Sequence, residues 1–589
     1  MDTANSLLTA KELALALEEI ATLLELKGEN PFKIRAYTAA ARTLSALTMP
    51  LSDFIDAIAA HQVKGFGPAI TEKVTILYQT GSLPYLEELR GGFPTEIRQL
   101  LQVPGLGAKK VKILFDELKI ASIADLERAC NENKVAALKG FGDKTQQKIL
   151  QGITQFRNFS DQYLLIDARN VGLAVLERLQ SSGLATKVEL AGSLRRSKEV
   201  VRDIDLLAAS KTPKKLMELF VSHPLVGSVT AHGETKSSIV LSNGIAADLR
   251  VVSDTEFPAA LQYFSGSKEH NTIVRGIAKK KGLKLNEYGL FKGEKALRLS
   301  SEEELYHALG LAFIPPEARE NQGEIELAQK LFSEGKSFPQ LVSAGDIKGI
   351  LHAHTTYSDG KNTLAELAVA VRDFGYEYLG VSDHSQSAAY AGGLRVEAIK
   401  RQHEEIDELN QKLAPFIIFK GIESDILADG SLDYLDSVLE SFDFVIASVH
   451  SRFGMSEDEM TSRIIRAASN PFTTILGHMT GRLLLQREGY PLDVRAVLET
   501  CATHGVAVEL NANPRRFDLD WRFLRLATEL KIPIPINPDA HAIDQVPFVN
   551  LGVGIARKGW LTSAQVLNCR DARAMQEFFH ARKRSRGQR

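Results

Sequence analysis

Cysteine and tryptophan are scarce in this chain of 589 residues, which has three of the former and two of the latter. Cys130, Cys501 and Cys569 are too far apart for a Cys-x-x-Cys zinc site, and they offer no disulfide framework. No apolar run is long enough to span a bilayer, and the amino terminus has the acidic amphipathic pattern of a helix rather than a secretory signal. These absences predict a reducing, cytoplasmic location and no membrane partner.

An excess of charge of one sign is also missing, because the formal net charge is −2 at pH 7. Contact with nucleic acid would therefore come from local patches or backbone amides rather than from a general positive field. One such patch runs from Arg275 to Arg298, with eight lysines or arginines against two glutamates. A solvated charged face is the alternative interpretation of this run. The length of the chain predicts several domains.

Three glycine turns mark the first 160 residues: Lys-Gly-Phe-Gly at 64–67, Pro-Gly-Leu-Gly at 104–107 and Lys-Gly-Phe-Gly at 139–142. Two glycines around one apolar residue permit a tight turn in which the apolar side chain packs inward and the amides face phosphate oxygens. Ordinary helix–helix turns are the alternative. The turns resemble helix-hairpin-helix motifs, which implies DNA contacts at Gly65, Gly67, Gly105, Gly107, Gly140 and Gly142.

The stretch 31–37, together with Thr71-Glu72-Lys73, resembles the small lyase domain of DNA polymerase beta. The resemblance puts Lys73 where that family has its Schiff-base lysine, and so implies a 5′-deoxyribose phosphate or AP lyase activity. A lysine must lose its proton to attack a sugar aldehyde, which requires nearby positive charge or burial. Ala69 stands where the family has a neighbouring lysine, so a solvated structural lysine is an equal alternative for Lys73.

An apolar run at 188–190 leads into Gly192-Ser193, where a helix can begin. The exposed amides of a helix start bind triphosphates well, and Arg195 and Arg196 add positive charge. This segment predicts a nucleotide-binding turn.

Three carboxylates follow on two predicted strands. Asp203 and Asp205 alternate around Ile204, so on a strand both face the same side. Asp248 lies in the apolar run 244–252, which also has a strand pattern. Three hard oxygen ligands can hold two divalent ions, Mg²⁺ or Mn²⁺, for nucleotidyl transfer.

This constellation resembles the nucleotidyltransferase palm, and the segment after it resembles the thumb of family X DNA polymerases. The resemblance implies that Gly192, Ser193 and Arg196 bind the nucleotide, and that Arg275 and Tyr288 contact DNA. It adds a second set of nucleotide contacts, namely Tyr263, Phe264, Gly266, Ser267 and Asn271. Arg202 replaces the usual glycine before the Asp pair, and Lys268 replaces an acidic residue of some relatives; neither change removes a candidate metal ligand.

Seven short apolar runs recur in the last 240 residues, each ending on polar residues of the kind that bind metals. Helical patterns separate the runs, so they predict a parallel sheet closed into a seven-stranded, distorted TIM-like barrel. Functional groups gather at the carboxyl ends of barrel strands. Nine candidate ligands lie at these ends: His352, His354, Asp359, His384, Glu423, His450, His478, Asp539 and His541.

The array resembles the PHP (polymerase and histidinol phosphatase) domain. The resemblance implies up to three divalent metals, and a donor set without thiolate suits Mn²⁺, Zn²⁺ or Fe. It also implies phosphoester hydrolysis, with Asp359 and Glu423 as bridging ligands. His384 and Asp383 each serve either as a ligand or as a support for ligands, and Arg515 and Arg516 are either phosphate contacts or a solvated basic loop.

The sequence therefore predicts a multidomain fold: an all-α helix-hairpin-helix region, an α+β palm and thumb, and an α/β barrel. The expected boundaries are a lyase-like domain at 1–85, fingers at 86–160, palm at 161–255, thumb at 256–316, linker at 317–345 with a flexible part at 317–336, barrel at 346–575 and basic tail at 576–589. The last nine residues of the tail are expected to be disordered and solvated, or to add DNA affinity that does not depend on sequence. The resemblance covers nearly the whole chain and implies a monomeric gap-filling repair polymerase that uses deoxynucleoside triphosphates on gapped or primed DNA. Its barrel would act as a Mn²⁺-dependent 3′–5′ exonuclease. A small-molecule phosphatase fused to a polymerase and a non-catalytic DNA scaffold are the alternatives.

Overall fold

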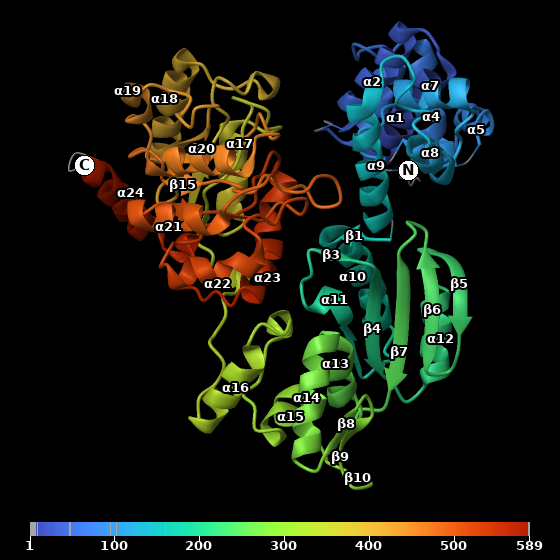
Figure 1. Cartoon of the computed structure of the whole chain (residues 1–589), viewed down its shortest axis with the longest axis vertical. Coiled ribbons are helices and arrows are strands. Elements are labelled where there is room, and N and C mark those ends of the chain that lie inside the picture. The colour runs from blue at the N-terminus through green and yellow to red at the C-terminus, as the bar shows by residue number, and fades with distance from the viewer. Residues whose placement is uncertain are drawn as a thin grey trace. The chain divides into compact units, whose positions relative to one another are not determined.

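The computed structural model describes residues 8, 10–45, 47, 49–94, 96–101, 103–159 and 161–586. The chain divides into two compact units, Met1–Asp161 and Gln162–Arg589, whose elements are labelled in Figure 1. No helix in the described ranges combines the length and the apolar character needed to cross a bilayer.

The first unit is helical. Leu13, Leu17, Ile20 and Leu24 are buried at helical spacing along the first helix and form part of the core of the unit. The helices are α1 (Ala10–Lys27), α2 (Pro31–Ser45), α3 (Leu51–Ala59), α4 (Pro68–Thr80), α5 (Pro84–Gly91), α6 (Ile97–Leu100), α7 (Ala108–Leu118), α8 (Ile123–Asn131) and α9 (Gly142–Phe159).

The three glycine turns precede α4, α7 and α9, and their middle residues, Phe66, Leu106 and Phe141, are buried. The first glycine of each turn has positive φ, a conformation that favours glycine. An added Cβ at any of the six turn glycines would find no atom within 4 Å. The turns thus pack their apolar residue inward and leave open space over their backbone.

The second unit begins with a five-stranded sheet of order β2-β4-β7-β6-β5, in which only β4 and β7 run parallel. Figure 1 shows β4, β7, β6 and β5 side by side. The elements of this region are β1 (Tyr163–Leu164), α10 (Leu165–Ser181), β2 (Lys187–Leu190), α11 (Gly192–Arg195), β3 (Val200–Val201), β4 (Asp203–Ala209), α12 (Pro213–Val221), β5 (Val226–His232), β6 (Lys236–Leu241) and β7 (Ala246–Val252).

A smaller helical layer with a three-stranded antiparallel sheet follows. Its elements are α13 (Phe257–Ser265), α14 (Lys268–Lys280), β8 (Lys284–Asn286), β9 (Gly289–Lys292), β10 (Lys295–Ala296) and α15 (Glu302–Ala308).

The flexible part expected within the linker at 317–345 is wrong as a description of this segment, which contains η1 (Pro316–Ala318), α16 (Glu324–Ser333) and η2 (Ala344–Asp346). Ile325 and Ala328 of α16 are buried in one core with α15. The polar residues that suggested flexibility are buried in pairs, because Arg319 reaches Glu302 and Glu324 reaches His270. Buried charges of this kind need partners, and here they have them.

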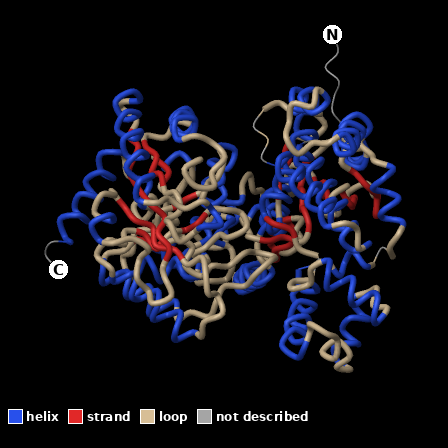
Figure 2. Tube along the Cα trace, turned by 90° about the horizontal axis from the view of Figure 1, so that it is seen from above, coloured by secondary structure: helices blue, strands red, loops and turns tan. Residues whose placement is uncertain are grey.

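The remaining region is a curled parallel sheet of order β11-β12-β13-β14-β15-β16, followed by the parallel pair β17-β18. Figure 2 shows these strands in the interior with helices around them. The strands are β11 (Gly349–Ile350), β12 (Tyr378–Val381), β13 (Ile417–Asp425), β14 (Phe444–Ser448), β15 (Ile475–Leu476), β16 (Ala507–Val508), β17 (Leu510–Asn511) and β18 (Ile536–Asn537).

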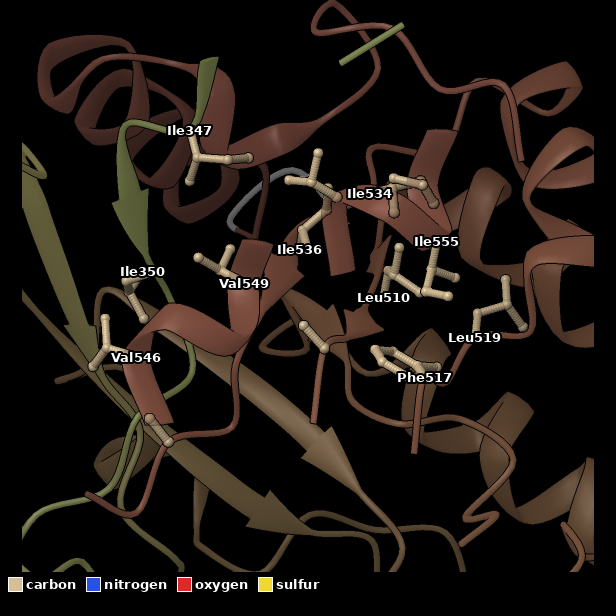
Figure 3. Close-up of a cluster of buried hydrophobic side chains, with 14 of the residues drawn as sticks. Ile347, Ile350, Leu510, Phe517, Leu519, Ile534, Ile536, Val546, Val549 and Ile555 are labelled. Carbon is tan, nitrogen blue, oxygen red and sulfur yellow. The ribbon is translucent and has the colours of Figure 1, made fainter. Parts of the chain in front are cut away.

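Helical segments cover this sheet: α17 (Leu364–Asp373), η3 (Ala389–Ala391), α18 (Val396–Leu413), α19 (Asp436–Leu439), α20 (Glu457–Ser469), α21 (Val494–His504), α22 (Trp521–Glu529), η4 (Ile543–Phe548), α23 (Val549–Lys558), η5 (Leu567–Cys569) and α24 (Ala572–Arg586). Figure 3 shows apolar side chains of β17, β18, η4 and α23 in one buried cluster, with Leu510, Ile536, Val546 and Val549 among them.

The basic tail expected at 576–589 is wrong up to residue 586, because α24 includes it. Phe579 is 1% exposed and stacks on Phe444, with ring centroids 5.1 Å apart. Arg582 donates to the carbonyl oxygens of His504 and Thr473. Residues 587–589 lie outside the described residues. Although this segment is rich in basic residues, its helix also has an apolar face that packs on the sheet.

Candidate active sites

The three palm carboxylates lie on two adjacent parallel strands. Asp205 of β4 is paired in register with Asp248 of β7. The buried residues Ile204, Ala247 and Leu249 alternate with them, so the carboxylates share the opposite face. The strand prediction is therefore confirmed, and the acidic side chains occupy the face that the alternation indicates.

Gly192 starts α11 directly against Asp205. Its φ is +57°, and an added Cβ would lie 2.2 Å from Oδ2 of Asp205. Burial, with smaller contributions from Asp203 and Asp248, raises the pKa of Asp205 to about 6. A cation beside Asp205 would relieve this crowding of negative charge. Lys236 of β6 already supplies one cation, since its Nζ lies 2.8 Å from Oδ2 of Asp248.

The α13–α14 turn brings several of the expected nucleotide contacts together. Asn271 donates from Nδ2 to the carbonyl oxygen of Tyr263 (2.6 Å), and an added Cβ at Gly266 would lie 2.4 Å from Oδ1 of Asn271. Ser267 caps α14 by accepting from the His270 amide. Phe264 lies edge-on to Tyr263. The turn is thus a tightly hydrogen-bonded unit in which Gly266 leaves room for Asn271.

Arg196 is buried and already bonded on one side. Its Nε donates to Glu320 (3.0 Å) and its Nη1 donates to the carbonyl oxygen of Ser265 (2.7 Å). Arg195 is held by Glu302 and by Ser265 Oγ. Both guanidiniums are therefore paired within the fold, Arg195 with a carboxylate that it shares with Arg319 and Arg196 with Glu320. Arg196 keeps Nη2 without a hydrogen bond to any described residue.

The remaining polymerase-side candidates are separate from this turn. Arg275 is exposed on α14 in a pocket with Lys279 and Lys284. Tyr288 is 57% exposed and lines a different cavity of about 710 Å³. In the first unit, Lys73 Nζ donates to the carbonyl oxygen of Ala69 and lies over the ring of Tyr85.

All nine residues expected as ligands lie close together: seven come from strands of the curled sheet or the loops after them, and two, Asp539 and His541, follow β18. Glu423 lies at the centre: its oxygens are 2.9 Å from Nε2 of His478, 2.9 Å from Nδ1 of His384 and 3.4 Å from Nε2 of His450. Three overlapping groups have ligand atoms within 4.8 Å of one another: His354, Asp359, His384 and His541; His352, His354 and Asp539; and His384, Glu423 and His450.

The donor set fits divalent metal ions. His352 Nε2, His354 Nδ1 and His478 Nδ1 are buried without a hydrogen-bond partner among the described residues. Nδ1 of His384 and Oε2 of Glu423 are also buried and face each other at 2.9 Å without forming a hydrogen bond. Buried polar atoms without partners are costly in a native fold. Imidazole and carboxylate donors without thiolate suit Mn²⁺, Zn²⁺ or Fe, and the residues alone do not distinguish among these ions.

The charges of the array shift its pKa values strongly. Burial would lower the pKa of His450, but Glu423 and Asp425 raise it to about 10. Burial, with His541 and His384, lowers the pKa of His354 to about 3. The two imidazoles thus differ widely in pKa, because carboxylates outweigh burial at His450, whereas burial dominates at His354 even though Asp539 lies 3.2 Å from its Nε2.

Matches to known families cover most of the chain. The helix-hairpin-helix domain model matches 9–83, the SAM-like helix-hairpin-helix tandem 97–154, the DNA polymerase beta thumb 260–320 and the PHP domain 351–513. The chain is 38% identical over 572 residues to the DNA polymerase/3′-5′ exonuclease PolX of Bacillus subtilis (strain 168), spanning 96% of this chain and 99% of that protein. It belongs to the family X DNA polymerases that carry a C-terminal PHP domain.

More distant relatives match parts of this family X polymerase. DNA polymerase lambda of Rattus norvegicus is 23% identical over 52% of this chain and 55% of that protein. Repair DNA polymerase X of African swine fever virus (strain Badajoz 1971 Vero-adapted) is 31% identical over 23% of this chain and 83% of its own length. A probable phosphatase of Caldanaerobacter subterraneus is 29% identical over 27% of this chain and 60% of that protein.

Sequence reasoning missed the residues that support the array in this polymerase. Asp425 accepts from Nδ1 of His450 (2.6 Å), and Glu509 lies 2.7 Å from Nδ1 of His352. Both residues could have been found from the sequence pattern that indicates the ligands, because Asp425 shares a strand face with Glu423 and Glu509 lies in one of the seven apolar runs. Asp383 accepts from Thr355, Ser358 and Gln402, which makes it a support rather than a ligand.

Proposed function

We propose that this enzyme fills short gaps in DNA at the palm and shortens 3′ ends at the PHP domain, acting in DNA repair. The observation that carries the proposal is one chain with two separate sites: a three-carboxylate strand face beside a glycine turn, and a nine-residue donor array. The close relative named as both polymerase and exonuclease supports this division.

In the palm, Asp203, Asp205 and Asp248 are the proposed ligands of two divalent ions. These ions would activate the primer 3′-hydroxyl and neutralise charge on the triphosphate and the leaving pyrophosphate. The residues of the chain orient the reactants: the amides at Gly192 and Ser193 and the side chain of Arg196 bind phosphates. We propose that the Tyr263–Asn271 turn contacts the nucleotide and that Arg275, Tyr288 and the six turn glycines contact DNA.

In the PHP domain, the nine donors His352, His354, Asp359, His384, Glu423, His450, His478, Asp539 and His541 are the proposed ligands of up to three ions. Those ions would supply a hydroxide nucleophile and neutralise the phosphodiester. Asp425 and Glu509 orient the rings of His450 and His352 through their Nδ1 atoms, which leaves Nε2 of each ring to face the site. We further propose that the seven strand segments close into a barrel, since a parallel bridge joins Ala353 to Ala540.

One gel tests the division of labour. A 5′-labelled primer in a one-nucleotide gap is incubated with Mn²⁺, with and without nucleotides, using wild type, Asp205→Ala and His354→Ala. We expect extension to be lost only in Asp205→Ala and shortening to be lost only in His354→Ala. Loss of both activities in one variant, or shortening that survives His354→Ala, would contradict the assignment.

A small-molecule phosphatase is the second candidate for the PHP domain, since a probable phosphatase is among the relatives. Hydrolysis of p-nitrophenyl phosphate faster than shortening of the gapped primer, at equal enzyme concentration, would favour that function. A non-catalytic scaffold predicts that neither substrate changes and that the purified protein contains no stoichiometric metal.

We also propose Lys73 as a lyase nucleophile. A second cation shares an aromatic neighbour with Lys73, since Lys33 and Lys73 both lie over the ring of Tyr85, at 5.9 and 4.7 Å from its centroid. Borohydride trapping on DNA with a 5′-deoxyribose phosphate should give a covalent adduct in wild type and none in Lys73→Ala. An undiminished adduct in Lys73→Ala would exclude this role. A monomeric state and a cytoplasmic location stay predictions, and light scattering would test the first.

A further inference from the structure

A short segment at the end of the thumb match, before the barrel, carries charges that pair in two directions. Glu317 and Glu320 reach Arg557 and Lys558 at the end of α23, while Arg319 reaches Glu302 in the thumb. We call residues 317–320 the strut. The strut thus connects the PHP domain to the polymerase part of the same compact unit through salt bridges.

Glu320 is shared between the two domains. Its Oε1 accepts from Lys558 Nζ of the barrel (2.5 Å) and from Arg196 Nε of the palm (3.0 Å). Lys558 is 1% exposed, and Glu320 is the acidic residue within salt-bridge distance of it among the described residues. Burial opposes ionisation of Glu320, but the charges of Lys558 and Arg196 lower its pKa, so the carboxylate stays charged.

The α23 helix also packs on the loop that follows α11. An added Cβ at Gly554 would lie 2.6 Å from Ser197 Oγ. Arg196 stands one residue before that contact, and its charge acts on the nearby Asp205. Lys558 is therefore connected to the palm site through one carboxylate and one guanidinium.

We propose that Lys558, a residue of the PHP domain, is a positioning residue for the polymerase: it neutralises Glu320 so that Arg196 presents a net positive charge to the incoming nucleotide. This inference rests on the proposed nucleotide-binding role of Arg196. The local charge of Arg196, Glu320 and Lys558 together is +1. Without Lys558 the sum falls to zero, because the full charge of Glu320 then acts on Arg196. A triphosphate binds less well beside such a neutralised arginine.

The test is single-nucleotide insertion into a gapped primer by the full chain, measured as KM for the deoxynucleoside triphosphate and kcat separately. We expect Lys558→Met to raise KM by about tenfold with kcat nearly unchanged. Arg557→Met is the matched control, because it removes a cation from the same helix end whose partner, Glu317, does not contact Arg196. Its KM should stay close to that of wild type.

A double variant separates charge from structure. In Lys558→Met with Glu320→Gln the local charge returns to +1, and the glutamine oxygen can still accept from Arg196, so KM should recover to near wild type. Lys558→Gln, which keeps a hydrogen bond to Glu320, is the second single variant should the Met variant fold poorly. It should also raise KM.

The outcomes differ clearly. An unchanged KM in the Lys558 single variants, or a double variant that does not recover, overturns the inference and indicates a purely structural lysine. A fall in kcat of all variants together with a lower melting temperature would also overturn the inference and indicate a purely structural lysine. Wild-type enzyme that adds no nucleotide at all would instead refute the proposed polymerase function.

Discussion

Gly192→Ala is the sharpest probe of the palm site, because this glycine is required for two separable reasons. Its positive φ makes a Cβ strained, at a cost of about 1–2 kcal/mol in the free energy of unfolding. The Cβ would also lie 2.2 Å from Oδ2 of Asp205, whereas real Cβ contacts begin near 3.0 Å. The flexible carboxylate can give way at little cost in stability, but it must move by about 1 Å, a displacement that can cost about 10²-fold in rate.

Gly183→Ala is the matched control. Gly183 also has positive φ, at +66°, but an added Cβ finds nothing within 4 Å. We expect both variants to lose similar stability in thermal melts. Only Gly192→Ala should lose about 10²-fold in the single-turnover rate of nucleotide insertion, with shortening of 3′ ends unchanged in both. Insertion rates of the two variants within threefold of each other would refute the link from Gly192 to Asp205.

Three further perturbations test other parts of the chain. Asp425→Asn should lower 3′-end shortening by about 10- to 100-fold while nucleotide insertion is unchanged, because His450 loses the carboxylate that orients it; equal loss of both activities on the gapped primer would contradict this. In EDTA at pH 7.5, Asp205→Asn should raise the melting temperature. The folded-state pKa of Asp205 is about 6 and lies above the unfolded value, so the ionised carboxylate destabilises the fold above pH 6. This contribution vanishes below about pH 4. Equal melting temperatures of Asp205→Asn and wild type at pH 7.5 would exclude the effect. In denaturant melts, Phe579→Ala should lower the stability of the barrel by about 3–5 kcal/mol, since its ring is buried against Phe444. Arg573→Ala, on the exposed face of the same helix, should cost under about 0.5 kcal/mol. Similar costs for the two variants would mean that α24 does not pack as described.

Local patterns predicted well where the candidate residues lie on the strands. Alternation around Ile204 indicates a shared carboxylate face, and the structure pairs Asp205 with Asp248 in register. Apolar runs that end on His, Asp or Glu indicate donors at one edge of a sheet. The structure places eight of the nine in groups of possible ligands, and the ninth, His478, lies against Glu423. Such predictions succeed because period-two alternation and strand–helix order depend on neighbouring residues alone.

Contacts between distant segments could not be predicted in this way. Glu320 pairs with Arg196, 124 residues away in sequence, and with Lys558, 238 residues away. No pattern in the neighbouring sequence indicates either pairing. The same cause explains why the predictions of a flexible linker and a solvated tail are wrong. The charged residues of these segments have partners that are distant in sequence: Arg319 pairs with Glu302, and Lys583 pairs with Asp443. Polar composition alone does not distinguish a buried salt bridge from a solvated chain.

The strut restricts how this protein can be recombined. Glu317, Arg319 and Glu320 pair with the barrel and the thumb within four residues, so one inserted or deleted residue would misalign every pair at once. A chimera that joins this palm to another barrel would need two basic residues at the corresponding end of its α23. Natural or laboratory exchange of the two domains should therefore succeed with a crossover before residue 317, because α23 is then exchanged together with its acidic partners, Glu317 and Glu320.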